Sequence, residues 1–519
     1  MANIFDYLKW RADIPFSLDP FNVVDNLVLA ELSYSRFADI IGPGESMTIE
    51  EASTRYFEVH SEEEIEDDSS YTRYAPVLLK HMANNERFGG TVIFNVMDEL
   101  DPENTEQMAA NAFKLPDGTI YIAYRGTDGT VTGWKEDCLL CYMSGTTGQK
   151  KAIDYLNNNF NNCDNLLRVG GHSKGGNFAV YAAAHANQNI FDRIINVYSN
   201  DGPGFLPDDV IVTEGYKKIV PKVISIIPHE SIIGMLLENE YKDVHIVRST
   251  AKGMVQHDAF TWRVLRNEFE QENEISDTSI FVKSVINGWL NDVSEEERAM
   301  FVTSLFSFFE VTGSEKIDEI GDEKLKNASA MYKNLKNMPE EERKLFFKNL
   351  GKFAEKAGDN MIDNMMSSAT DFFHKVIKSG TKEGNDEINA DEDDLIEEKV
   401  MEEFHQAMME AKTNVSGETE DVTEEKKSPV KLIRKAFSKR KVEQKNENDE
   451  NAGIEYTAED IPEEMQNMNE KAVTEKTVRD EQEDKKKTRL KVINKAVSKV
   501  KDRKAKDEEV ETEDADKKE

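Results

Sequence analysis

Cysteine is scarce in this chain, with three residues in 519. An odd and small number of cysteines gives no framework of disulfides, which is typical of a protein from a reducing compartment. The N-terminal residues show no basic region followed by an apolar core, so we expect no signal peptide. No apolar run approaches the roughly 20 residues that a membrane-spanning helix needs. These absences together predict a cytoplasmic protein.

Positively charged residues are also few. The chain has 65 lysines and arginines and 101 aspartates and glutamates, which gives a formal net charge of −36. Such acidity argues against broad nucleic-acid binding, and we expect no nucleic-acid partner. All four tryptophans and all three cysteines lie in the first three-fifths of the chain. The last part, residues 381–519, is rich in charge and poor in aromatic residues, so we predict a disordered tail.

Metal-ligand clusters and phosphate-binding loops are not apparent in the sequence. Cys138 and Cys141 have C-x-x-C spacing, but no second pair completes a zinc site and the two residues between them are leucines. We therefore interpret this segment as a buried helix face, and we expect neither a metal nor a cofactor.

One short motif stands out among what is present. Residues 170–176 read Gly-Gly-His-Ser-Lys-Gly-Gly, which contains the pattern G-x-S-x-G around Ser173. A short apolar segment precedes the motif and a stretch of small residues follows it, as expected for a strand and a packed helix. Strand, tight turn, serine and helix form a nucleophile elbow, in which Gly171 and Gly175 let two backbones pass closely.

Several apolar, β-branched runs surround this motif. They predict buried strands, typical of a mostly parallel sheet covered on both faces, so residues 1–265 are expected to form one α/β-hydrolase-like domain. The runs cover residues 118–125, 165–169, 193–199, 222–227 and 243–247. A helix is also expected after Asp19-Pro20, with Asp19 as its N-cap.

Helical patterns replace the strands in residues 266–380. Ser294 and Glu297 form a predicted capping box ahead of apolar residues at helical spacing, and Pro339 marks the start of another helix. This region is expected to be a small helical bundle. In the tail, residues 430–441 and 490–501 repeat one pattern of apolar and lysine positions. They could dock on an anionic membrane or a protein partner, or form transient helices paired with acidic neighbours.

A nucleophilic serine needs a base and an acid that orients it. His257 follows the last predicted strand, where this role is expected, and His229 is the second choice. Asp201 and Glu230 both follow strands and are the alternatives for the acid, with Asp201 favoured by its rigid Asp-Gly-Pro-Gly turn.

An oxyanion hole needs two backbone N–H donors that are already in place. We expect one from Lys174, the residue after the nucleophile. The other is expected from Gly126 or Thr127, in the loop that follows the strand at residues 118–125.

Several blocks of the sequence resemble known families. Residues 124–128 (Tyr-Arg-Gly-Thr-Asp), then Trp134 and Asp137, then residues 171–176 are similar to class 3 lipases. Residues 5–10, 200–205 and 256–258 resemble more closely the Mbeg-like family of bacterial α/β-hydrolase-type proteins. The resemblance covers roughly residues 1–310. It implies an α/β-hydrolase fold with Ser173 as nucleophile and His257 as base.

Two departures from the lipase pattern stand out. Lys174 replaces the usual leucine and is expected to place a cation beside the nucleophile, and Glu230 stands where lipases have aspartate. We predict a serine hydrolase that cleaves a small carboxylic ester or thioester through an acyl-enzyme on Ser173. The alternative is a non-catalytic scaffold of the same fold, which binds partners through its helical region and tail.

Overall fold

The computed structural model describes residues 2–67, 71–316, 324–380 and 390–416. The amphipathic segments 430–441 and 490–501 lie outside these residues, as does most of the predicted tail. All of these described residues belong to one compact unit. In the described part of the chain, no helix combines the length and the apolar character that crossing a bilayer requires.

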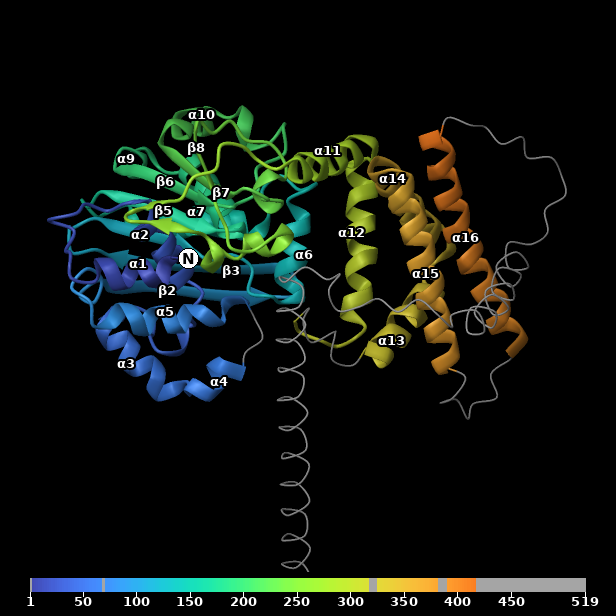
Figure 1. Cartoon of the computed structure of the whole chain (residues 1–519), viewed down its shortest axis with the longest axis horizontal. Coiled ribbons are helices and arrows are strands. Elements are labelled where there is room, and N and C mark those ends of the chain that lie inside the picture. Colours follow the sequence, from blue (N-terminus) through green and yellow to red (C-terminus); the bar gives the residue numbers. More distant parts are fainter. Residues whose placement is uncertain (1, 68–70, 317–323, 381–389, 417–519) are drawn as a thin grey trace, which may run out of the picture. The chain divides into compact units, whose positions relative to one another are not determined.

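An eight-stranded sheet forms the centre of the first half of the chain (Figure 1). The strands lie side by side in the order in which they occur in the sequence. Neighbours from β1 to β4 are antiparallel, and all neighbours from β4 to β8 are parallel. The strands are β1 Ser46–Thr48, β2 Val92–Asp101, β3 Glu106–Lys114, β4 Ile120–Tyr124, β5 Leu167–His172, β6 Ile194–Asn200, β7 Val223–Pro228 and β8 Asp243–Val247. The predicted α/β class is confirmed.

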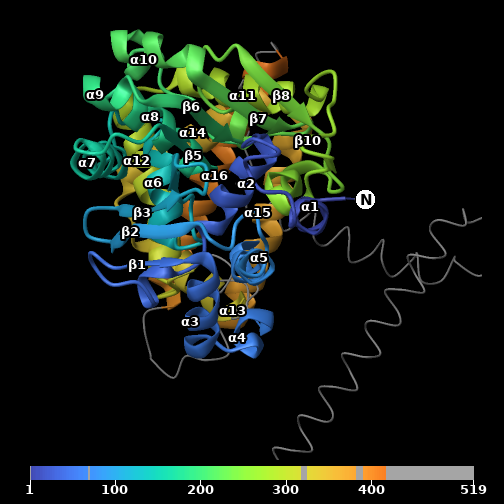
Figure 2. The same ribbon diagram turned by 90° about the vertical axis from the view of Figure 1, so that its left-hand side faces the viewer.

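Helices cover both faces of this sheet (Figures 1 and 2). On one face, α8 packs on β4, β5 and β6 and is flanked by α7 and α10, while α6 contacts β3. On the other face, α2 packs on β4 and β5 and contacts α1 and α5. The helices of this part are α1 Ile4–Arg11, α2 Val23–Leu32, α3 Ile49–Val59, α4 Glu62–Asp67, α5 Tyr74–Ala83, α6 Val131–Leu139, α7 Thr147–Phe160, α8 Lys174–Ala184, α9 Gln188–Phe191 and α10 Glu214–Ile219.

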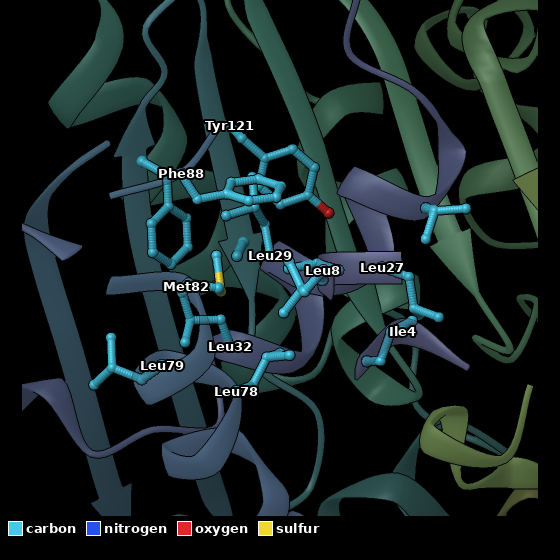
Figure 3. Packing of buried hydrophobic residues seen from close by; sticks show 14 of the residues in the cluster. Ile4, Leu8, Leu27, Leu29, Leu32, Leu78, Leu79, Met82, Phe88 and Tyr121 are labelled. Carbon is cyan, nitrogen blue, oxygen red and sulfur yellow. The ribbon is translucent and has the colours of Figure 1, made fainter. Parts of the chain in front are cut away.

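Each face of the sheet has its own apolar core. In Figure 3, leucines of α1, α2 and α5 meet above the sheet beside Met82, Phe88 and Tyr121. The second core contains the buried alanines of α8 together with Phe178 and apolar residues of β4, β5 and β6. Burial on both faces explains why these parallel strands are continuous apolar runs in the sequence, without alternation.

The start of α2 differs from the prediction. Asn22, not Asp19, is the N-cap, because its side chain accepts hydrogen bonds from the N–H groups of Val24 and Asp25. Asp25 completes a capping box by accepting from the N–H of Asn22.

A short two-stranded sheet, β9 Val264–Leu265 with β10 Glu268–Phe269, follows the α/β part and leads into consecutive helices. The predicted capping box of Ser294 and Glu297 is present at the start of α12, and α14 begins directly after Pro339. The helices are α11 Asp277–Asp292, α12 Glu295–Glu310, α13 Lys324–Asn337, α14 Glu340–Ala357, α15 Asp359–Gly380 and α16 Ala390–Ser416.

Helix α16 corrects the predicted start of the disordered tail at residue 381. Within a highly charged composition, Val400, Phe404, Met408 and Ala411 recur at helical spacing and are buried in one cluster with residues of α14. An apolar stripe three or four residues apart is enough to anchor a helix, even where average composition resembles a disordered segment.

Helix α12 contacts the segment that follows β4. The backbone N–H of Val131 donates to the carbonyl oxygen of Glu315 at 2.8 Å, and Lys135 of α6 pairs with Glu310 of α12 at 2.7 Å. Val131, Val302 and Phe306 form a small buried cluster between the two helices. The helical region thereby supports α6 directly.

Candidate active site

The turn between β5 and α8 has the geometry of a nucleophile elbow. Ser173 lies between the last residue of β5 and the first residue of α8, with φ 57° and ψ −131°. A serine with positive φ is strained, and such strain persists only where the surroundings impose it. A Cβ atom at Gly171 or Gly175 would collide with the backbone of Tyr124. Both glycines therefore have the role predicted from the sequence.

Ser173, His257 and Asp201 form a continuous hydrogen-bonded chain. The Oγ of Ser173 is 3.0 Å from Nε2 of His257, and Nδ1 of His257 is 2.6 Å from Oδ2 of Asp201. Asp201 is fully buried, and its other carboxylate oxygen accepts hydrogen bonds from the hydroxyl of Ser231 and the N–H of Gly234. These donors fix the carboxylate, which in turn fixes the tautomer and orientation of the imidazole.

Glu230 is not the partner of His257. Its carboxylate accepts hydrogen bonds from the N–H of Gly253 and, at 2.9 Å, from the amide of Gln256. Both donors lie in the 3₁₀ turn Gly253–His257, so Glu230 holds the turn that carries His257. His229, the second choice for the base, contacts the carbonyl oxygen of Glu274 at 2.7 Å.

The residues predicted for the oxyanion hole lie beside Ser173. Lys174 is the first residue of α8, whose N-terminus carries N–H groups without partners inside the helix. Gly126 is so close to the elbow that a Cβ atom there would lie 3.2 Å from the Cβ of Ser173. The hydroxyl of Thr127 donates to Oδ2 of Asp137 at 2.6 Å, which ties this loop to α6. Burial raises the pKa of Asp137 to about 6.

The side chain of Lys174 corrects one expectation, that of a cation beside the nucleophile. Its ammonium group extends into the interior, where it contacts Oε2 of Glu136 at 2.9 Å and the side-chain oxygen of Gln107 at 2.7 Å. The side chains of Lys174 and Glu136 are both fully buried. Glu136 also accepts from the N–H of Gly148 at 2.9 Å. The positive charge of Lys174 is thus neutralised in the interior, and the contacts of Glu136 link α8 to α6 and α7.

His172 is a site residue that the sequence analysis missed. Its Nε2 lies 2.9 Å from the backbone carbonyl oxygen of His257, and the hydroxyl of Tyr34 lies 3.1 Å from its Nδ1. Burial lowers the pKa of His172 well below the ordinary value, so the ring is neutral. With its proton on Nε2, His172 donates to His257 and accepts from Tyr34. Its place as the variable residue of G-x-S-x-G was the signal available in the sequence.

Cys138 and Cys141 lie on α6 and in the turn that follows it, beside apolar side chains. Burial raises the pKa of Cys141 to about 11 and also raises that of Cys138, so both remain thiols at neutral pH. Within the described residues, no group of three or more histidine, cysteine, aspartate or glutamate side chains could hold a metal ion.

The mostly parallel sheet and the helices on both of its faces define an α/β protein. A family model described as Mbeg1-like matches residues 82–307, which confirms the resemblance seen in the sequence. This range includes Ser173, Asp201 and His257.

Two lipases are among the solved structures that this chain matches. The crystal structure of M37 lipase is 15% identical with a TM-score of 0.26, covering 40% of this chain and 68% of that one. The native Rhizomucor miehei lipase propeptide complex is 12% identical with a TM-score of 0.28, covering 49% and 74% respectively. No curated protein matches the chain.

Proposed function

We propose that this protein is a serine hydrolase that cleaves a carboxylic ester or thioester through an acyl-enzyme on Ser173. The observation that carries the proposal is the unbroken hydrogen-bonded chain from Ser173 through His257 to the buried Asp201. A serine is a weak nucleophile by itself, and this arrangement supplies the base and the residue that orients the base.

The reaction has two halves. In the first, Nε2 of His257 takes the proton of Ser173 as Oγ attacks the carbonyl carbon, and Asp201 stabilises the imidazolium that forms. The same nitrogen then gives its proton to the leaving alcohol or thiol. In the second half, His257 takes a proton from water, which attacks the acyl group on Ser173, and returns it to Oγ as the acid leaves.

Backbone N–H groups would stabilise the negative oxygen of each tetrahedral intermediate. We assign one to Lys174 and the other to Gly126 or Thr127, because both segments flank Ser173. Removing one such donor typically slows the reaction about a hundredfold or more. The Thr127–Asp137 hydrogen bond and the Lys174–Glu136 pair hold these two segments in place.

A fluorophosphonate probe tests this function, because it reacts with an activated serine. We expect the full-length protein to be labelled at Ser173, as shown by intact mass and peptide mapping. Labelling should be lost in Ser173→Ala and retained in Ser284→Ala, a control at an exposed serine of α11. Absence of labelling in folded protein would overturn the proposal.

That negative result would favour the alternative, an α/β scaffold that binds partners through its helical region and tail. We also propose a cytoplasmic location, with which the three free cysteines are compatible.

A further inference from the structure

A cavity of about 810 Å³ lies among α3, α4, α5, β2 and the loop that follows β4. Its size is in the range of pockets that enclose small organic ligands. The side chains that matter here are Tyr34, Arg36, Tyr56, Asp98, Arg125 and Asp128. We refer to it as the α3–β4 cavity.

This cavity borders the candidate active site. The hydroxyl of Tyr34 and the Cβ of Ser173 both lie within about 3.2 Å of where a Cβ atom at Gly126 would be. Arg125 and Asp128, which also line the cavity, flank the proposed oxyanion residues Gly126 and Thr127 in the sequence. The cavity and Ser173 therefore lie on either side of Tyr34 and the loop at residues 125–128.

The cavity lies on the side of His257. Tyr34 contacts His172, which in turn contacts the carbonyl oxygen of His257. Arg73, another lining residue, acts electrostatically on Asp258, the neighbour of His257 in the chain. Since the leaving alcohol receives its proton from His257, the alcohol half of an ester has to lie on this side.

The chemistry of the lining is polar and balanced in charge. Eight of the sixteen lining residues are charged, and positive and negative side chains are equal in number. Arg125 is nearly buried and bonds to Asp98 at 2.7 and 2.8 Å and to Asp128 at 3.3 Å. An alkyl chain placed here would strip water from these groups without replacing their hydrogen bonds, which is unfavourable.

A hydroxyl group suits such a lining better, because it donates to carboxylates and accepts from guanidinium groups. The equal numbers of the two charges give no net attraction to an ion of either sign. Tyr34 and Tyr56 add apolar ring surface next to their hydroxyls.

We infer that the α3–β4 cavity binds a neutral, hydroxyl-rich alcohol half of the ester, such as a polyol or a sugar. This inference rests on the proposed hydrolase function and adds a substrate class to it: acyl esters of polyols rather than of long-chain alcohols. Arg36, a lining residue with a side chain 63% exposed, is a specificity residue in this assignment.

The test compares two butyrate esters, 6-O-butyrylglucose and hexyl butyrate, hydrolysed by the full-length protein in a pH-stat. We expect kcat/KM to favour the sugar ester by about tenfold or more, the equivalent of one hydrogen bond to a charged group. Arg36→Ala should reduce this preference several-fold through KM for the sugar ester. Arg55→Ala is the matched control, an arginine of α3 that is 52% exposed, pairs with Glu45 and lies outside the cavity lining. It should leave the preference unchanged.

The outcomes separate this inference from the function on which it depends. Equal or faster hydrolysis of hexyl butyrate would overturn the inference, and so would a preference that Arg36→Ala does not alter. If neither ester is cleaved while the fluorophosphonate probe labels Ser173, the substrate class is wrong and the hydrolase function stands. If the probe does not react, the hydrolase function itself falls.

Discussion

Nε2 of His172 lies 2.9 Å from the backbone carbonyl oxygen of His257, and the two imidazole rings face each other with centroids 4.6 Å apart. The residue before the proposed nucleophile therefore holds the backbone of the proposed base. Because a neutral, buried ring cannot exchange protons readily at neutral pH, His172 acts on position rather than on proton transfer.

Replacing His172 tests this positioning role. His172→Ala removes the hydrogen bond and leaves a cavity beside His257, so kcat for p-nitrophenyl acetate should fall about tenfold to a hundredfold with little change in KM. His172→Gln, whose amide can still donate to the carbonyl oxygen, should recover part of the loss. Wild-type kinetics in both variants would contradict the role.

Asp201 and Glu230 should differ sharply in their effect on activity. Asp201→Asn keeps the shape of the site but removes the charge that pairs with His257, so kcat should fall on the order of ten-thousandfold. Glu230→Gln alters only the support of the turn 253–257, and its effect should stay below about tenfold. Esterase assays on both proteins decide the matter, and a larger loss in Glu230→Gln would reverse the assignment of the acid.

Replacing one partner of the buried Lys174–Glu136 pair should destabilise the protein strongly, whereas replacing both partners should have a much smaller effect. Lys174→Leu restores the usual lipase residue but leaves the Glu136 carboxylate buried without its cation, which should destabilise the protein by about 3 kcal/mol or more. Urea unfolding followed by circular dichroism measures this loss.

The double variant Lys174→Leu with Glu136→Gln is the control for that experiment. Without an unpaired charge it should recover most of the lost stability, since apolar or neutral replacements of a buried pair are often tolerated. Glu136→Gln alone completes the cycle, and if the losses of the two single variants simply add in the double variant, the two side chains do not interact as the structure indicates.

Most of the sheet could be predicted from the sequence, because strands buried on both faces appear as short β-branched runs. Strands β4 to β8 fall where those runs are. The antiparallel strands β2 and β3 were not predicted. Strand β3 contains small and polar residues such as Ala109, Ala110 and Asn111, so no β-branched run marks it. Strand β2 begins with such a run, Val92-Ile93-Phe94, but charged residues fill its second half. Helix α16 was missed because average composition hides an apolar stripe among charged residues.

The core of the site was also predictable, since Ser173 lies in a motif that dictates local geometry and His257 follows the last strand. The choice between Asp201 and Glu230 was not, because both follow strands of the same sheet and only the fold decides which faces the imidazole. The direction of the Lys174 side chain depends on Glu136 and Gln107, far away in the sequence. No local pattern could reveal that partnership.

Asp137 gives a pH-dependent prediction about stability. Burial has the largest effect and raises the pKa of Asp137 from 3.8 to about 6. Lys174, the Thr127 hydroxyl and His257 lower this pKa, and Glu136 raises it, all by smaller amounts. A carboxyl group whose pKa is higher in the folded state binds a proton more tightly there, so its contribution to stability is greatest below pH 4. That contribution declines as the pH rises from about 4 to 6, by about 2 kcal/mol.

Asp137→Asn cannot ionise and should lack that decline. The free energy of unfolding of the variant, relative to wild type, should therefore increase between pH 4 and pH 6.5 and stay level above. Urea unfolding at four or five pH values measures this difference in unfolding free energy. The protonation of all other groups affects both proteins almost equally, so its contribution largely cancels in the difference. A flat difference for Asp137→Asn would mean that this carboxyl ionises as easily in the folded protein as in the unfolded chain.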